Sequence, residues 1–232
     1  PYRRELFGKL DGESGKHLTG VLGPRGAGKT ILLRQLAAAR QDAFYLSADT
    51  LPRETDLFGI VRDLAETYGF RSFFIDEIHY LDGGFAGLKK IYDFLPVRVV
   101  FTSSVALKIH EAAHDLSRRV RLYRLGYFSY REYLAVRHND RCPVLGMDSL
   151  LKGEAPAECL RAVDRFERYL TANILPFALE EPDPLPLLAS TVETIVGKDI
   201  PRFLRLNVDE LETIEKMIAF IGRSPVDGIN YS

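Results

Sequence analysis

Short apolar runs alternate with amphipathic stretches over the first 125 or so residues of the chain. The runs are rich in β-branched and aromatic residues, and the stretches between them repeat apolar positions at helical spacing. This alternation is typical of βαβ units and of a mostly parallel sheet with helices on its faces. The five predicted strands span residues 17–22, 43–46, 72–75, 97–102 and 120–125, and the predicted helices span 31–40, 54–68, 88–94 and 106–116. We therefore expect an α/β fold.

The pattern changes after Gly126, where strand-like runs give way to segments with helical periodicity. These segments span residues 130–137, 157–170, 187–196 and 209–221. Between them lie Pro176 and the proline-rich stretch 181–186, which a continuous helix cannot cross. We expect a second, all-helical region, with a hinge or a surface loop at the prolines.

Composition and charge narrow the class of protein. The 232 residues are 46% hydrophobic and 27% charged, as in soluble globular proteins, and the net charge is −1. Only a local basic patch could therefore bind nucleic acid. No apolar run approaches the roughly 18 residues that cross a bilayer, and the N-terminus lacks a signal-peptide core. We expect a cytoplasmic protein with no membrane partner, in which Cys142 and Cys159 are free thiols.

The strongest chemical signal is a glycine-rich segment, GPRGAGKT, that satisfies the GxxxxGK[ST] pattern between a predicted strand and a predicted helix. Such a loop turns backbone N–H groups toward phosphate oxygens, and the helix N-terminus adds positive partial charge. Lys29 would reach the terminal phosphates, and the Thr30 hydroxyl would bind Mg²⁺. The expected nucleotide contacts are Gly23, Pro24, Arg25, Gly26, Ala27, Gly28, Lys29, Thr30 and Ile31.

Two adjacent carboxylates, Asp76 and Glu77, end the third predicted strand. Asp76 would hold Mg²⁺ through its water shell, and Glu77 would polarise the attacking water. Because neighbouring side chains on a strand face opposite sides, we expect the pair to divide these two roles. The chain carries no NKxD guanine-recognition element, so ATP is the expected nucleotide.

Further candidates follow the fourth and precede the fifth predicted strand. Thr102 or Ser103 could orient the nucleophilic water, and Ser103 is the residue we select. Arg118 and Arg119 come at the end of the fourth predicted helix, from which either could reach the γ-phosphate of a neighbouring subunit. The alternative is that both arginines cap the helix C-terminus and stay solvated.

The ordered motifs resemble those of AAA+ ATPases, in particular a prokaryotic group with a GPRxxGKT loop, an Asp-Glu strand end, a sensor strand of small residues and a Gly-Arg before an LSFREYL-like segment. The corresponding residues are 23–30, 73–78, 102–104, 118–119 and 128–134. Ser103 and Arg118 stand where that group has glycine. The resemblance aligns Arg119 with the group's arginine, which would act on a neighbouring subunit in a homo-oligomer.

The same resemblance implies a five-stranded core in the order 5-1-4-3-2, a helical lid, and a winged-helix and nuclease-like region further on. We accordingly expect a P-loop core over residues 1–128, a lid-like region over 129–206, and over 207–232 the start of a winged helix that continues beyond Ser232. DNA is then an expected partner of the C-terminal domain.

One rival motif, His110-Glu111-x-x-His114, matches the HExxH pattern of zinc hydrolases on a predicted helix. The extended form of that motif needs glycine at Ser117 and histidine at Val120. The zinc-dependent hydrolase stays a distant alternative, beside two solvated histidines. A basic cluster interleaved with tyrosines, at residues 118–131, could contact single-stranded nucleic acid or simply follow strand alternation.

These observations favour an ATPase that uses Mg²⁺ to hydrolyse ATP to ADP and phosphate and couples its nucleotide state to a lid or C-terminal domain movement. Its activity could require an oligomer or a partner. The alternative is a nucleotide-gated binding switch with negligible intrinsic hydrolysis, whose sequence would look almost identical.

Overall fold

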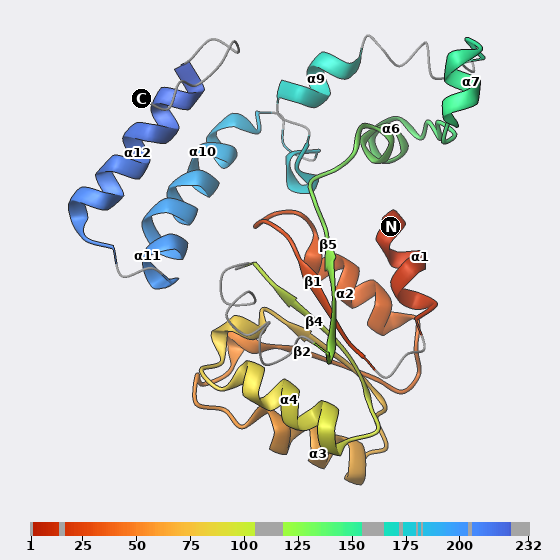
Figure 1. The fold of residues 1–232 in the computed structure, drawn as a ribbon, viewed down its shortest axis with the longest axis vertical. Coiled ribbons are helices and arrows are strands. Elements are labelled where there is room, and N and C mark those ends of the chain that lie inside the picture. Colours follow the sequence, from red (N-terminus) through yellow and green to blue (C-terminus); the bar gives the residue numbers. More distant parts are fainter. Residues whose placement is uncertain are drawn as a thin grey trace. The chain divides into compact units, whose positions relative to one another are not determined.

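Five parallel strands form the sheet on which the rest of the fold is arranged. They are β1 (Leu18–Leu22), β2 (Ala43–Ser47), β3 (Ser72–Asp76), β4 (Arg98–Ser103) and β5 (Val120–Arg124). Their order in the computed structural model is β2-β3-β4-β1-β5, and every pair runs parallel (Figure 1). The strands predicted from the apolar runs and the strand order implied by the family resemblance are both confirmed.

The structure describes residues 2–13, 17–104, 118–154, 165–171, 174–179, 181, 183–203 and 206–223. The chain divides into two compact units, residues 1–182 and residues 183–232. The sheet and the helices around it belong to the first unit. The domain boundaries that we expect at residues 128 and 206 stay predictions.

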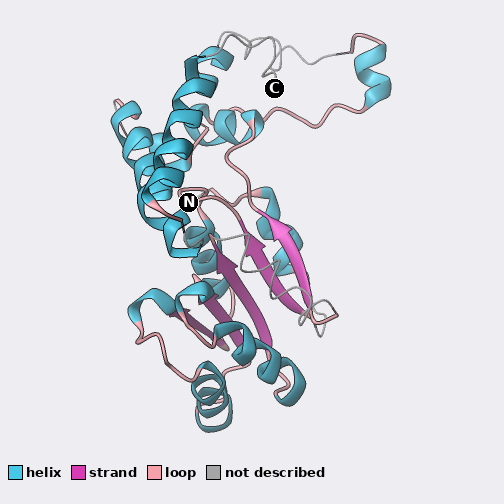
Figure 2. Ribbon diagram, turned by 60° about the vertical axis from the view of Figure 1, so that its left-hand side comes forward, coloured by secondary structure: helices cyan, strands magenta, loops and turns pink. Residues whose placement is uncertain are grey.

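Helices cover both faces of the sheet, as Figure 2 shows for the strands in magenta. They are α1 (Glu5–Asp11), α2 (Lys29–Ala38), α3 (Leu57–Thr67) and α4 (Gly84–Phe94), with short 3-10 turns η1 (Ala48–Thr50) and η2 (Ile78–Tyr80) after β2 and β3. Helix α1 was not expected from the sequence, because seven residues are too few for helical periodicity to stand out. The predicted helix 106–116 lies outside the described residues.

Strand alternation sorts the core side chains into two layers. On β3, Phe73 and Ile75 pack in one buried cluster with residues of α3 and α4, whereas Phe74 points the other way into a cluster with residues of α1 and α2. On β4, Phe101 belongs to the first cluster and Val100 to the second. The central strands β1, β3 and β4 are buried on both faces and are accordingly rich in apolar residues, whereas the edge strand β5 carries Arg121 and Arg124 and is largely exposed.

Helical segments follow β5 within the first unit: α6 (Tyr130–His138), α7 (Met147–Leu151), α9 (Phe166–Thr171) and the 3-10 turn η4 (Pro176–Leu179). Helix α6 begins with a capping box, in which the side chains of Ser129 and Glu132 each accept a hydrogen bond from the other's backbone N–H. A third buried cluster, centred on Phe128, Tyr133 and Leu179, joins α6 to η4. Part of the predicted helix 157–170 lies outside the described residues.

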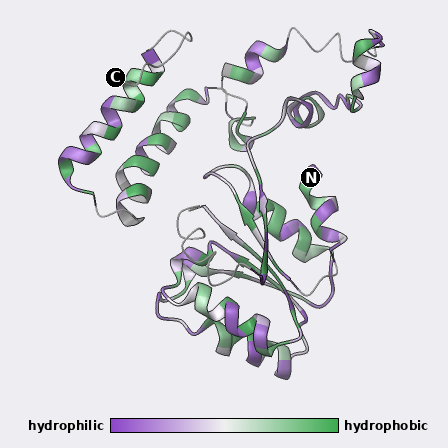
Figure 3. Cartoon of the chain, viewed as in Figure 1, coloured by the Kyte–Doolittle hydropathy of each residue, from purple (hydrophilic) through white to green (hydrophobic). Residues whose placement is uncertain are grey.

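The second unit contains α10 (Leu185–Thr194), a π-helical turn η5 (Ile195–Asp199), α11 (Ile200–Phe203) and α12 (Val208–Arg223). Helix α10 begins inside the proline-rich stretch, because a proline in the first helical turn removes no hydrogen bond that the helix needs. Figure 3 shows hydrophobic residues along much of α10 and alternating hydrophilic and hydrophobic bands along α12. Among the described residues, no helix is both long and apolar enough to cross a membrane.

Gly20 on β1 offers a test of how tightly side chains of the neighbouring strands β4 and β5 pack over this position. A Cβ at this position would come within 2.6 Å of Leu122 and 2.8 Å of Phe101. We expect Gly20→Ala to lower the free energy of unfolding by about 1–3 kcal/mol, as overpacking does. Urea unfolding measures the change.

The matched control is Gly8→Ala in α1, where a Cβ would meet open space. Alanine in a helix is favoured over glycine by about 1 kcal/mol, so this variant should be at least as stable as the wild type. Equal stability of Gly20→Ala and Gly8→Ala would contradict the packing described for β1.

Candidate functional site

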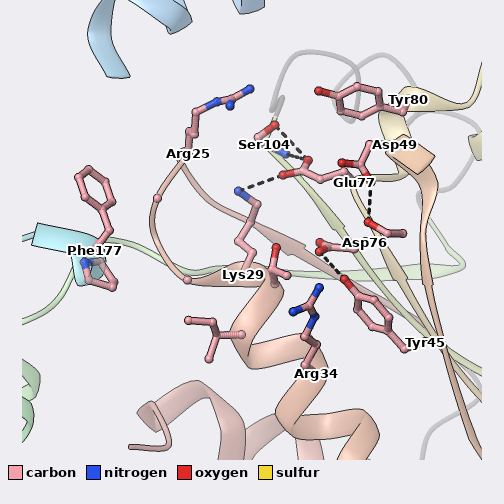
Figure 4. A pocket seen from close by; sticks show the side chains of 16 residues that line it. Arg25, Lys29, Arg34, Tyr45, Asp49, Asp76, Glu77, Tyr80, Ser104 and Phe177 are labelled. Atoms are coloured by element: carbon pink, nitrogen blue, oxygen red, sulfur yellow. Dashed lines mark hydrogen bonds and ion pairs between the residues drawn. The ribbon is translucent and has the colours of Figure 1, made fainter. Parts of the chain in front are cut away.

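The candidate site lies at the carboxyl ends of β1, β3 and β4. The chain leaves β1 for β2 on one side, returns through β3 and β4, and then crosses to β5 on the other side of β1. In open α/β sheets, ligands bind at the carboxyl ends of the strands where the order reverses in this way. The phosphate-loop sequence follows β1, and the two carboxylates end or follow β3, so the topology brings both motifs to one place (Figure 4).

The phosphate-loop segment turns tightly between β1 and α2. Gly26 and Gly28 have φ angles of 80° and 89°, in the left-handed region that glycine adopts without steric cost. At Gly23 a Cβ would lie 2.2 Å from the carbonyl oxygen of Leu125, so the loop passes directly against the chain that follows β5. Gly28 is the N-cap of α2 and has no side chain to accept from the first N–H groups, which leaves them available to an anion.

Lys29 is buried at the start of α2, with 5% of its surface exposed. Its Nζ donates to the carbonyl oxygens of Gly23, at 2.9 Å, and Pro24, at 3.1 Å, and lies 3.7 Å from Glu77 Oε1. Burial lowers the pKa of Lys29, while Glu77 and Asp76 oppose this shift. An anionic group placed beside the ammonium would favour its charged form further.

Asp76 is almost fully buried at the end of β3. Its Oδ2 accepts a hydrogen bond from the Tyr45 hydroxyl at 3.0 Å, and its Oδ1 accepts one from the Thr102 hydroxyl. Both carboxylate oxygens keep a second lone pair, so the group can also accept from water or bind a cation.

Glu77 lies just past the strand, in a left-handed conformation with φ 50° and ψ 48°. The Thr102 hydroxyl accepts from its backbone N–H at 2.9 Å, so one hydroxyl connects the two acidic residues. Glu77 Oε2 accepts from the backbone N–H and the hydroxyl of Ser104, each at 3.1 Å, and lies 3.2 Å from Nδ1 of His79. A left-handed non-glycine residue is uncommon and costs about 1 kcal/mol or more, which these contacts offset.

This backbone turn changes the geometry expected from strand alternation. We expected Asp76 and Glu77 to face opposite sides of the sheet, but both side chains line the same cavity. The reason is that β3 ends at Asp76, and the left-handed turn at Glu77 redirects the next side chain.

The two serines at the end of β4 are placed differently from one another. Ser103, which the sequence analysis selects, is fully buried, and its hydroxyl lies 3.1 Å from His79 Nδ1. Ser104 lines the cavity and holds Glu77. Ser104 is therefore the serine that reaches the site, where it contacts Glu77, while Ser103 faces the interior beside His79.

A cavity of about 590 Å³ collects these groups. Its lining residues are Arg25, Gly26, Gly28, Lys29, Thr30, Ile31, Arg34, Tyr45, Ser47, Asp49, Asp76, Glu77, Tyr80, Ser104, Pro176 and Phe177. Sequence reasoning missed Arg34, Tyr45 and Phe177. Arg34 could have been found from its spacing, one helical turn after Thr30, whereas Tyr45 and Phe177 come from other elements and only tertiary structure brings them here.

A second cavity, of about 430 Å³, adjoins the first and shares Gly28, Ile31 and Pro176 with it. Its wall is more apolar. The remaining lining residues are Tyr2, Arg4, Leu32, Gln35, Phe128, Val136, Arg137 and Leu179. A ligand bound at the glycine-rich turn can thus extend into an apolar space formed by α2, the N-terminal segment and the residues after β5.

The candidate arginines lie at the amino ends of the strands, away from the carboxyl ends that form the candidate site. Arg119 immediately precedes β5, and its carbonyl accepts from the N–H of Leu18, the first residue of β1. Its guanidinium pairs with Asp93 at the end of α4, with Nε 2.9 Å from Oδ1, and lies over the Tyr92 ring. Neither Arg118 nor Arg119 lines the cavity of its own chain.

The HExxH motif at His110 and His114 lies outside the described residues. Within the described residues, no group of three or more histidine, cysteine or acidic side chains could hold a metal ion. The winged helix that we expect from residue 207 onward and its contact with DNA both stay predictions.

Comparison with known families agrees with the loop and the sheet. A family model described as an AAA domain matches residues 15–134, which is more than half of the chain and contains the glycine-rich turn, both carboxylates and all five strands. No curated protein matches the chain. The matched region, together with the parallel sheet and the phosphate-loop geometry, shows that the chain belongs to the AAA domain family of P-loop proteins.

Proposed function

We propose that the chain binds ATP with Mg²⁺ and hydrolyses it to ADP and phosphate. The observation that carries the proposal is the meeting of a buried lysine, at the end of a glycine-rich turn, with two carboxylates in a single cavity. A phosphate chain would replace the carbonyl oxygens that Lys29 now contacts, and the N–H groups of the turn would surround its oxygens. Membership of the AAA domain family independently indicates nucleotide binding.

Thr30 and Asp76 are the residues that would hold Mg²⁺. Both line the cavity, and a hydroxyl with a carboxylate, supplemented by water and phosphate oxygens, is the donor set that Mg²⁺ prefers. Tyr45 and Thr102 hold the Asp76 carboxylate in place. Bound there, the cation would neutralise charge on the phosphate oxygens.

Glu77 is proposed to be the general base. Ser104 fixes its Oε2, and its Oε1 faces Lys29 and the cavity. A water molecule between Glu77 and the terminal phosphate would give its proton to Oε1 as its oxygen bonds to the γ-phosphorus. The bond between that phosphorus and the β–γ bridging oxygen would break, and ADP would leave with the bonding electrons.

The second cavity is the proposed position of the adenine base. It shares Gly28 and Ile31 with the first, so a nucleotide with its phosphates at the turn can reach it directly. Leu32, Phe128 and Leu179 supply apolar contact for a planar ring. Since Phe128 and Leu179 come from the chain after β5, base binding would couple nucleotide state to the helical segments there.

Lys29→Ala tests nucleotide binding. The substitution removes the ammonium nearest the proposed phosphates, a buried charge-assisted contact worth about 2–4 kcal/mol, so ATP affinity should fall by that amount. Thermal stabilisation by ATP and Mg²⁺ should disappear with it. Lys90→Ala, on the exposed side of α4, is the matched control and should keep both. Unchanged nucleotide-dependent melting of Lys29→Ala would refute the assignment of the phosphate site.

Glu77→Gln separates binding from hydrolysis. The amide keeps the size of the side chain and can still accept from Ser104, but it cannot take the proton. ATP should bind with near wild-type affinity, while single-turnover hydrolysis should slow by about two orders of magnitude or more. Glu66→Gln, exposed on α3, is the control. Wild-type turnover by Glu77→Gln would assign the base elsewhere, and equally negligible turnover by the wild type would favour the nucleotide-gated switch.

Arg119 tests whether activity needs an assembly. Because Arg119 lies away from its own cavity, it can act only on a neighbour's nucleotide, where an arginine of this kind is worth about 10³–10⁵ in rate. Specific activity should rise with protein concentration, and Arg119→Ala should abolish that rise. Asp93→Asn is the control, since it breaks the ion pair and keeps the arginine. Mixing Arg119→Ala with Glu77→Gln should recover activity. Mixtures that stay inactive, with oligomers confirmed by sedimentation, would exclude a role between subunits.

A further inference from the structure

Arg4, in the segment just before α1, uses every N–H of its guanidinium. Its Nε and Nη2 donate to the two carboxylate oxygens of Glu132, each at 2.7 Å. Nη2 also donates to the carbonyl oxygen of Tyr127, and Nη1 donates to those of Gly126 and Ala27, each at 2.9 Å. A guanidinium has five N–H groups, and all five are used. No other side chain could reproduce this set, because lysine offers three donors without the planar fork.

The acceptors belong to three separate parts of the chain. Ala27 is in the glycine-rich turn, Gly126 and Tyr127 form the connection between β5 and α6, and Glu132 is in the first turn of α6. Glu132 accepts in addition from the backbone N–H of Ser129, the N-cap of α6. One side chain therefore attaches the start of α6 and the phosphate-binding turn to the N-terminal segment.

The pair is protected from solvent, with 11% of the Arg4 side chain and 7% of the Glu132 side chain exposed. Burial acts to raise the pKa of Glu132, but hydrogen bonds from Arg4 and Ser129 outweigh it, and the pKa lies below its usual value. Glu132 therefore stays ionised at neutral pH, and the bidentate pair keeps its full strength there.

The connection between β5 and α6 in turn positions the wall opposite the glycine-rich turn. The N–H of Phe128 donates to the carbonyl oxygen of Ile174 at 2.7 Å, and the Tyr169 hydroxyl donates to the carbonyl oxygen of Phe128 at 2.6 Å. Just after Ile174, the Phe177 ring packs so closely on Gly26 that a Cβ there would lie 2.6 Å away. The segment that Arg4 holds is thus joined, through the hydrogen bond from Phe128 to Ile174, to the neighbouring segment from which Phe177 reaches the turn.

We propose that Arg4 is a positioning residue for the nucleotide site, which it serves by holding the glycine-rich turn and the start of α6 in the one arrangement that forms both cavities. This inference rests on the proposed function. The proposal also assigns a role to the LSFREYL-like segment at residues 128–134, because its Glu132 accepts hydrogen bonds from Arg4. Binding at the turn and ordering of α6 are then coupled through a single guanidinium.

Arg4→Lys is the test, since it keeps the charge and removes the fork. ATP affinity, measured by calorimetry with the full chain, should fall about tenfold, with KM raised far more than kcat is lowered. ATP should also slow amide hydrogen exchange at residues 126–134 in the wild type and lose this effect in the variant. Arg40→Lys is the matched control: Arg40 bonds Asp11 at the other end of α1, away from the turn, so affinity should stay within twofold.

Glu132→Gln is a second variant, in case Arg4→Lys does not fold. It keeps an oxygen acceptor for Arg4 and loses the charge, so it should show the same pattern in weaker form. Wild-type ATP affinity in a folded Arg4→Lys or Glu132→Gln protein, or wild-type exchange that does not respond to ATP, would overturn the inference alone. A wild-type chain that binds no ATP would overturn the proposed function and this inference with it.

Discussion

The parallel pairing of β1 with β4 at the centre of the sheet is the constraint on which the site depends. This pairing aligns Leu22 with Ser103, so the turn that follows Leu22 and the hydroxyl groups of Thr102 and Ser104 come to the same edge. The pairing of β3 with β4 aligns Ile75 with Phe101 and brings Asp76 beside Thr102. A shift of register would separate the acidic groups from the turn, and it is prevented because β1, β3 and β4 bury alternate side chains in two different clusters.

Buried charge explains much of the local geometry around the cavity. Lys29 is surrounded by protein, and an isolated buried ammonium is costly, so carbonyl oxygens and Glu77 approach it. The same requirement holds Asp76 against two hydroxyl groups and Arg4 against Glu132 and three carbonyl oxygens. The contacts of Lys29 and those of Arg4 differ in a way that matters for ligand binding. The contacts of Lys29 can be exchanged for those of an anionic ligand, whereas those of Arg4 hold together parts of the framework itself.

The helical segments after β5 are attached to the sheet by specific polar contacts as well as by apolar packing. The cluster around Phe128, Tyr133 and Leu179 is small compared with the two clusters of the sheet. The hydrogen bonds of Arg4 to Gly126, Tyr127 and Glu132 add polar attachment to this small cluster. The residues that complete both cavities, Pro176 among them, come from this part of the chain.

The sequence by itself determined the strands, most of the helices and the two motifs at the cavity, because each has a local cause. Apolar runs buried on both faces predict parallel strands, and the glycines of residues 23–28 allow a turn that other residues would strain. The short helix α1 escaped this reasoning, since seven residues carry too little periodicity.

Tertiary structure alone decided how the side chains meet. Glu77 turns into the cavity because its left-handed backbone is stabilised by Thr102, a residue 25 positions away in the chain. Ser104 rather than Ser103 reaches Glu77 because the chain leaves β4 at that point. Arg4 and Glu132 are 128 positions apart, and no local pattern in either segment indicates the other. Contacts of this kind depend on the register and crossing of distant elements, which hydrophobic periodicity does not encode.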